Sequence, residues 1–90
     1  MKVMPPKDPQ AVKDYRVNWV DWLPVGDTIT ASSWIVPAGI TAASTGFTTT
    51  TTTVWLTGGK AGSRYVLTNR IVTNDGRTED RSFEVPVTET

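Results

Sequence analysis

Apolar side chains recur at every second position along several stretches of this chain, with polar side chains between them. Tyr15, Val17 and Trp19 alternate with mostly polar neighbours in residues 13–20, and residues 65–72 alternate in the same way. A period of two residues predicts a β-strand with one buried face, because successive side chains of a strand point to opposite faces. No stretch of ten residues shows the period of a helix.

The strand predicted for residues 28–36 changes its pattern halfway. Ile29 and Trp34 are both apolar, but they would fall on opposite faces of a regular strand. Either a β-bulge at Ser32–Ser33 restores the register, or the strand changes the face that it buries.

The middle of the chain predicts two further strands, and its last third predicts a hairpin. A run of six threonines, Thr48–Thr53, enters the strand predicted for residues 49–57, because β-branched side chains suit a pleated, half-exposed strand. A short strand is predicted within residues 40–47. Asn74-Asp75-Gly76 predicts a hairpin turn, and residues 77–87 return as the partner strand. The sequence therefore predicts an all-β domain of six or seven strands.

Tyr65 indicates which all-β class this is. It follows Gly62-Ser63-Arg64 at the opening of the penultimate strand, and so resembles the tyrosine corner of immunoglobulin-like and fibronectin III-like domains. In that corner the Tyr hydroxyl bonds back to the preceding loop. There is no Cys–Trp–Cys pattern, so an antibody-type domain is excluded. We predict an antiparallel immunoglobulin-like β-sandwich over residues 12–90, with Tyr65 as a structural corner.

Three prolines interrupt the N-terminal residues. Proline fixes φ and cannot donate to a β-ladder, so residues 1–11 are predicted to form an extended arm outside the fold. Either the arm has no fixed structure, or a partner orders it. Trp22 lies in a loop beside Pro24, and Lys60 lies in a loop with three glycines. The candidates for partner binding are Pro5, Pro6, Lys7, Pro9, Trp22 and Lys60.

Charge and composition narrow the classes of partner. The ninety residues suit one domain, and nine basic residues balance nine acidic ones without any basic run, which argues against nucleic-acid binding. The uncharged stretch between Asp27 and Lys60 is too rich in Thr, Ser, Ala and Gly for a membrane span. The N-terminus lacks the apolar stretch of a secretory signal. The absence of cysteine favours assembly in a reducing cytoplasm.

The inventory of side chains argues against catalysis. The chain has no His and no Cys, which removes the commonest general base and the best nucleophile. Glu79 and Asp80 are neighbours in a predicted strand, so they point to opposite faces and cannot share a site. We predict no enzyme, no catalytic residue and no cofactor.

Calcium and glycans are the remaining ligands to weigh. Asp75 lies in a hairpin turn that explains it without a metal, and Asp21 and Asp27 flank a loop that lacks the dense Asp/Asn pattern of a calcium site. No metal site is predicted.

The tryptophans are either core residues or a platform for stacking sugars. We predict the core for Trp19, Trp34 and Trp55, because burying an aromatic ring removes a large apolar area from water. Trp22 lies in a loop and is the tryptophan that we predict to contact a partner.

Motifs along nearly the whole chain resemble a family of short phage proteins, the fibre–tail adaptors. They include Asp21-Trp22, Trp34-Ile35-Val36-Pro37-Ala38-Gly39-Ile40 and Thr68-Asn69-Arg70-Ile71-Val72-Thr73. The resemblance implies a non-enzymatic virion protein that links a tail or capsid surface to fibres. It implies other virion proteins as partners (tail, portal-proximal or capsid, and fibre), several copies on a symmetric particle, and assembly in the bacterial cytoplasm. The alternatives are a head decoration protein and an adhesive module that binds host glycans through Trp22.

Overall fold

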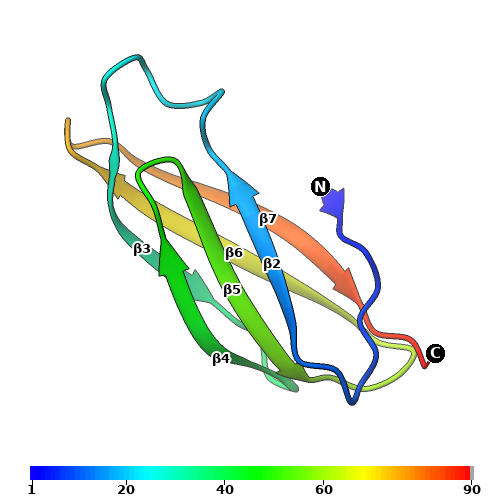
Figure 1. The fold of residues 1–90 in the computed structure, drawn as a ribbon. Coiled ribbons are helices and arrows are strands. Elements are labelled where there is room, and N and C mark those ends of the chain that lie inside the picture. Colours follow the sequence, from blue (N-terminus) through cyan, green and yellow to red (C-terminus); the bar gives the residue numbers. More distant parts are fainter. Residues whose placement is uncertain (90) are drawn as a thin grey trace.

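The computed structural model describes residues 1–89, which form seven strands and no helix (Figure 1). The strands are β1 (Lys2–Val3), β2 (Lys13–Asn18), β3 (Ile29–Ile35), β4 (Ile40–Phe47), β5 (Thr51–Gly58), β6 (Arg64–Thr73) and β7 (Thr78–Pro86). The predicted all-β class is confirmed. The predicted hairpin turn is also confirmed, because Asn74-Asp75-Gly76 joins β6 to β7 with Gly76 at a φ of 87°.

Two sheets lie face to face. One has the strand order β1-β7-β6-β3 and the other the order β2-β5-β4. All pairs are antiparallel except β1 with β7, which is parallel. The chain passes from one sheet to the other between β1 and β2, between β2 and β3, between β3 and β4, and between β5 and β6. The apolar face of each sheet is thereby buried against the other, as the alternating pattern predicts for a sandwich.

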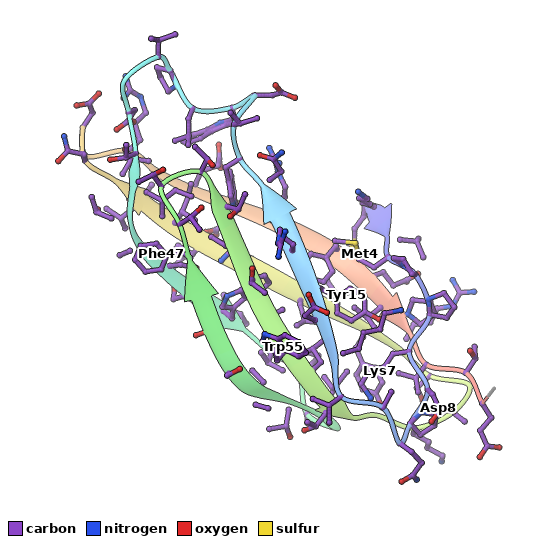
Figure 2. The ribbon with its side chains drawn as sticks, in the orientation of Figure 1. Met4, Lys7, Asp8, Tyr15, Phe47 and Trp55 are labelled. Carbon is purple, nitrogen blue, oxygen red and sulfur yellow. The ribbon has the colours of Figure 1, made fainter. Side chains whose placement is uncertain are left out.

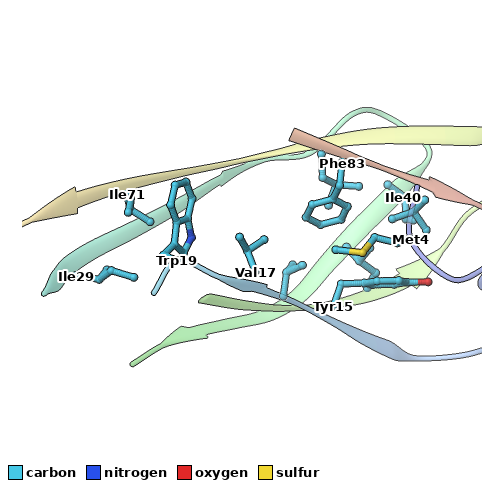
Figure 3. Close-up of a cluster of buried hydrophobic side chains, with 12 residues drawn as sticks. Met4, Tyr15, Val17, Trp19, Ile29, Ile40, Ile71 and Phe83 are labelled. Carbon is cyan, nitrogen blue, oxygen red and sulfur yellow. The ribbon is translucent and has the colours of Figure 1, made fainter. Parts of the chain in front are cut away.

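The core consists of the inward-facing residues of both sheets. Trp19, Val54, Leu56, Leu67 and Ile71 are fully buried. In the close-up of Figure 3 the core extends along the sandwich, from Ile29, Trp19 and Ile71 at one end to Phe83, Met4 and Tyr15 at the other. Phe83 lies at the centre of an aromatic group, with ring centroids 6.2 Å from Tyr15 and 5.8 Å from Trp34.

The β-bulge of β3 lies earlier than predicted. The register of β3 against β6 shifts between Ile29 and Ala31, so the extra residue is Thr30 and not Ser32 or Ser33. The physical reason is the side chain of Asn69, whose Nδ2 donates to Ser32 Oγ and to the Ser33 carbonyl, both at 3.0 Å. These bonds hold Ser32 and Ser33 in regular register with β6. The bulge therefore lies nearer the β2–β3 loop, at Thr30.

The N-terminal segment is part of the sandwich, which corrects the expectation that residues 1–11 lie outside it. Met4 belongs to the core, and the β1 strand pairs with β7 (Figure 1). A proline removes only its own donor. The residues on either side of Pro5-Pro6 keep theirs, and Met4 N donates to the Glu84 carbonyl at 2.8 Å while Lys7 N donates to the Pro86 carbonyl at 2.9 Å. The prolines therefore interrupt the ladder without preventing it.

Trp55 lies on the outside of the sandwich, although the sequence suggested a core position for it. Its side chain is 42% exposed, and Figure 2 shows it on β5. The reason is the parity of β5, where Thr52, Val54 and Leu56 occupy the buried face. The residue between Val54 and Leu56 must then point outward, whatever its hydrophobicity.

Candidate interaction surfaces

A buried polar network joins the two sheets at Asn69. Its Oδ1 accepts hydrogen bonds from Trp19 Nε1 at 3.1 Å and from Thr52 Oγ1 at 2.6 Å, while its Nδ2 donates to β3. Asn69 and Thr52 are fully buried. The Asn69 amide therefore finds its hydrogen-bond partners inside the fold. The polar groups of Asn69, Trp19 and Thr52 are thus used to hold the two sheets together and are unavailable to a ligand.

The β2–β3 loop and the β6–β7 hairpin are tied together by a buried carboxylate. The side chain of Asp27 is fully buried, and its Oδ2 accepts from Arg77 Nη1 at 2.9 Å. Its Oδ1 accepts from the backbone N–H groups of Thr28 and Asp75, at 3.0 and 3.1 Å. Burial by itself would raise the pKa of Asp27, but hydrogen bonds from Thr73, Asp75, Arg77 and Thr28 together hold this pKa below its usual value.

Arg77 lies between the carboxylates that these two loops carry. Its guanidinium also contacts Asp75, with Nη1 3.2 Å from Oδ2. One guanidinium thus contacts both of the carboxylates that the loops bring together. Within residues 1–89 no group of three or more His, Cys, Asp or Glu side chains is placed to hold a metal ion.

Tyr65 lies at the opposite end of the sandwich and holds the β5–β6 loop. Its hydroxyl accepts a hydrogen bond from the backbone N–H of Lys60 at 3.0 Å, which is the geometry of a tyrosine corner. Gly39 and Gly59 both have positive φ, and the Tyr65 ring lies between them. A Cβ on Gly59 would approach Val87 Cγ2 to 2.8 Å, so the close packing of this end requires glycine.

Lys7 is buried, which corrects the expectation that it is available to a partner. It has no exposed surface, and its Nζ donates to the carbonyls of Gly58 at 2.7 Å and Asp8 at 2.9 Å. Burial lowers the pKa of Lys7, while the charge of Asp8 opposes this shift. Figure 2 shows Lys7 on the segment between Met4 and Asp8. Its ammonium group ties this segment to the end of β5.

The other predicted partner residues do not form one surface. Pro5 and Pro6 are exposed, but their carbonyls accept from Tyr15 Oη at 2.9 Å and from Lys13 Nζ at 3.1 Å. Trp22 is half-buried and packs edge-on against Trp19, with ring centroids 5.6 Å apart. Figure 1 shows the β2–β3 loop, which carries Trp22, at the opposite end of the sandwich from the β5–β6 loop, which carries Lys60. Pro9 is half-buried and Lys60 exposed.

The sequence analysis missed a hollow of about 350 Å³ at the open edge between β2 and β7. Its lining residues are Lys2, Met4, Arg16, Val17, Asn18, Arg81, Ser82 and Phe83. Arg81 lies over the indole of Trp19, with Cζ 4.4 Å from the ring centroid, and its Nη1 donates to the Asn18 carbonyl at 3.2 Å. Arg16 and Arg81 are far apart in the sequence, and only the packing of the two sheets brings both to the lining of one hollow.

Among solved structures, the PKD domain from KIAA 1837 protein is similar to this chain, with a TM-score of 0.55 and 20% sequence identity. The match covers 98% of this chain and 84% of that domain. This likeness supports the fold alone, and it places the chain among immunoglobulin-like β-sandwich domains. The family model described as podophage GP4 fiber-tail adaptor protein gp77 matches residues 7–86. The chain belongs to this family.

No curated protein matches this chain. In the part of the chain that the structure describes, no helix is long and apolar enough to cross a membrane.

Proposed function

We propose that this chain is a non-enzymatic virion protein that links the phage tail to its fibres. The observation that carries the proposal is the family match, which extends from Lys7 to Pro86. The matched residues include six of the seven strands, from β2 to β7, and not one motif within the sandwich. The partners that follow are tail and fibre proteins, and the location is the virion.

The contacts inside the fold support a protein that acts by its shape. The buried polar groups of Asn69, Asp27 and Lys7 are all used to hold strands and loops together. The groups with shifted pKa values also include Arg70 and Asp80, which form a bidentate pair with bonds of 2.8 and 2.9 Å. Perturbed groups of this kind mark structural ion pairs as often as active sites. None of them is paired with a nucleophile.

Several copies on a symmetric particle would turn weak contacts into firm attachment. When one copy has docked, the next contact of the same assembly forms at a high effective concentration. A domain with no cysteine also needs no oxidation step before it assembles, which suits the bacterial cytoplasm. The proposal therefore requires only modest affinity at each contact.

A glycan-binding role is the second candidate, and the exposure of Trp55 favours it. The flat, 42% exposed indole lies on a sheet face beside its cross-strand neighbours Asp14 and Ser44, which offer hydrogen-bonding groups. Trp22, in contrast, is engaged with Trp19. Binding of a glycan array by the purified chain, lost in Trp55→Ala and kept in Val12→Ala, would support this second role.

The test of the adaptor role is complementation of a phage that lacks this chain. We expect particles made without it to carry tails but no attached fibres, as measured by cryo-electron microscopy and by the fibre content of purified virions. Supplying the chain in trans should restore the fibres and place the chain between tail and fibre. A full set of fibres in its absence would overturn the proposal, as would density for the chain on the head alone.

A further inference from the structure

The arginines of this protein divide into two groups. Three of them form ion pairs with carboxylates at 3.2 Å or less: Arg64, Arg70 and Arg77. Arg16 and Arg81 have no carboxylate partner within residues 1–89, and both line the hollow between β2 and β7. Lys2 joins them, and the lining includes no Asp or Glu. In a chain of zero net charge, this is a local excess of positive charge.

The hollow combines these cations with apolar groups. Met4, Val17 and Phe83 line it together with the three cationic side chains, and its volume is about 350 Å³. Arg81 is held in place by the Trp19 ring and the Asn18 carbonyl, so little of its side-chain entropy remains to be lost on binding. A ligand that offers a carboxylate next to an apolar side chain fits this lining.

A free stretch of sheet edge continues from the hollow. Met4 N donates to the Glu84 carbonyl, so the backbone of Glu84 faces the N-terminal segment. Alternation along β7 then turns the backbone groups of Ser82, Asp80 and Thr78 toward the same edge. The β1 strand reaches only as far as Phe83, and no other described strand pairs with β7 on this side.

One backbone amide of this edge is bonded by a side chain in place of a strand. The Asp80 N–H donates a hydrogen bond to Glu79 Oε1 at 3.0 Å, and both residues are exposed. Charged residues on an edge often serve to prevent pairing between copies of a protein. A second copy of the chain at this edge would bring its own Arg81 and Lys2 next to the cations of the hollow. The like charges would repel each other and disfavour the pairing of two copies. The same cations favour an acidic occupant.

We propose that β7 residues 78–82, together with the hollow of Lys2, Arg16 and Arg81, receive an extended acidic segment of another virion protein. The segment adds to the sheet edge through its main chain, its carboxylates contact the three cations, and an apolar side chain enters the hollow. This is strand addition, in which backbone hydrogen bonds give affinity and alternate side chains give specificity. The origin of the segment, though not the chemistry of the site, rests on the proposed adaptor role.

The first test uses short synthetic peptides and the purified full chain. We expect a labelled peptide of alternating glutamate and valine to bind, and a peptide of alternating lysine and valine not to bind, by fluorescence anisotropy. Lys2→Gln with Arg16→Gln should weaken binding about tenfold or more, because each removes a charge-assisted contact. Neither residue has a charged partner inside the fold, so this variant keeps its stability. The matched control is Arg64→Gln, which removes an arginine of β6 that lies outside the hollow.

Backbone amides distinguish an added strand from simple charge attraction. Hydrogen exchange should slow at Ser82 and Asp80 when the glutamate peptide is bound. Dextran sulfate, a polyanion without a peptide backbone, should give no such protection. Equal binding by the double variant, or protection that is absent with the peptide, would overturn the proposal. Tighter binding of dextran sulfate than of the peptide would show an anionic polysaccharide site and overturn it equally.

The second test uses assembled particles and a carbodiimide, which joins amines to nearby carboxylates. Mass spectrometry should find Lys2 linked to an Asp or Glu of another virion protein. Particles that contain the chain but show Lys2 unlinked, or linked only to this chain, would overturn the inference and leave the adaptor role intact. Particles from which the chain is absent would overturn the adaptor role, and with it the origin of the segment, while the peptide assay still decides whether the edge binds acidic strands.

Discussion

The indole N–H of Trp19 donates a 3.1 Å hydrogen bond to the amide oxygen of Asn69, which belongs to the opposite sheet. Thr52 Oγ1 donates to the same oxygen at 2.6 Å, so one amide satisfies two buried donors. An unsatisfied buried donor costs far more than an average hydrogen bond contributes. The two sheets are therefore held in one relative position by a polar contact as well as by apolar packing.

Asn69→Ala should be among the most destabilising single changes in this chain. It leaves the Thr52 hydroxyl without its acceptor, and Trp19 Nε1 keeps only its longer 3.3 Å bond to Thr52 Oγ1. One buried donor left unsatisfied costs about 1–3 kcal/mol. The free energy of unfolding in urea, followed by tryptophan fluorescence, measures this loss. Asn74→Ala in the exposed hairpin turn is the control and should change it little. If both variants unfold at the same urea concentration, the network does not contribute to stability.

Met4→Ala tests the place of the N-terminal segment in the fold. Met4 is 9% exposed and belongs to the core, so its truncation should lower the free energy of unfolding by about 2–5 kcal/mol. The neighbouring Val3 is 56% exposed, and Val3→Ala should have almost no effect. A chain without residues 1–8 should fail to fold stably. Two equally stable point variants would mean that the segment lies on the surface.

Tyr65→Phe should lower stability by about 0.5–1.5 kcal/mol, because the hydroxyl loses its bond to the Lys60 N–H. We expect the lower half of this range, since Lys60 is exposed and water can replace the hydroxyl as acceptor. The ring itself stays in place between Gly39 and Gly59. Chemical denaturation of both proteins is the measurement, and a difference of zero would contradict a role for the corner.

Asp27 should make the protein sensitive to acid. Its pKa in the folded state lies below the value in the unfolded chain, so the stabilisation is complete above the unfolded pKa and is lost as the pH falls through the folded pKa. The melting temperature of the wild type should therefore fall as the pH drops below about 4, the unfolded value for Asp. Asp27→Asn should melt lower at neutral pH and depend less on pH in this range. Parallel curves for the two proteins would contradict this prediction.

The strands could be predicted from the sequence because each depends on its own local pattern. The alternation around Tyr15 and Val17 and the turn at Asn74-Asp75-Gly76 act over neighbouring residues, and the structure has β2 and the β6–β7 hairpin there. The errors concern segments whose placement depends on distant residues. Trp55 is as hydrophobic as any core residue. It lies outside only because Val54, its neighbour in the strand, points inward.

The candidate site was less accessible to sequence analysis for the same physical reason. Lysine is usually a surface residue. The burial of Lys7 depends on the Gly58 carbonyl, which accepts a hydrogen bond from Lys7 Nζ. Arg16 and Arg81 each look like a solvated strand residue. Their shared hollow exists only because β2 and β7 form neighbouring edges of two different sheets. Periodicity identifies strands but contains no information on which edges face one another.

The parallel pairing of β1 with β7 has a mechanical consequence. Under the proposed adaptor role, a pull on the fibre would put this chain under load, and tension applied at its two ends would act along both strands in opposite directions. The bonds from Met4 N to Glu84 O, from Lys7 N to Pro86 O and from Thr88 N to Lys7 O would then bear the load together, in shear, and would not open one after another. The proline-rich segment would thus hold the two ends of the chain together and keep the domain folded under tension.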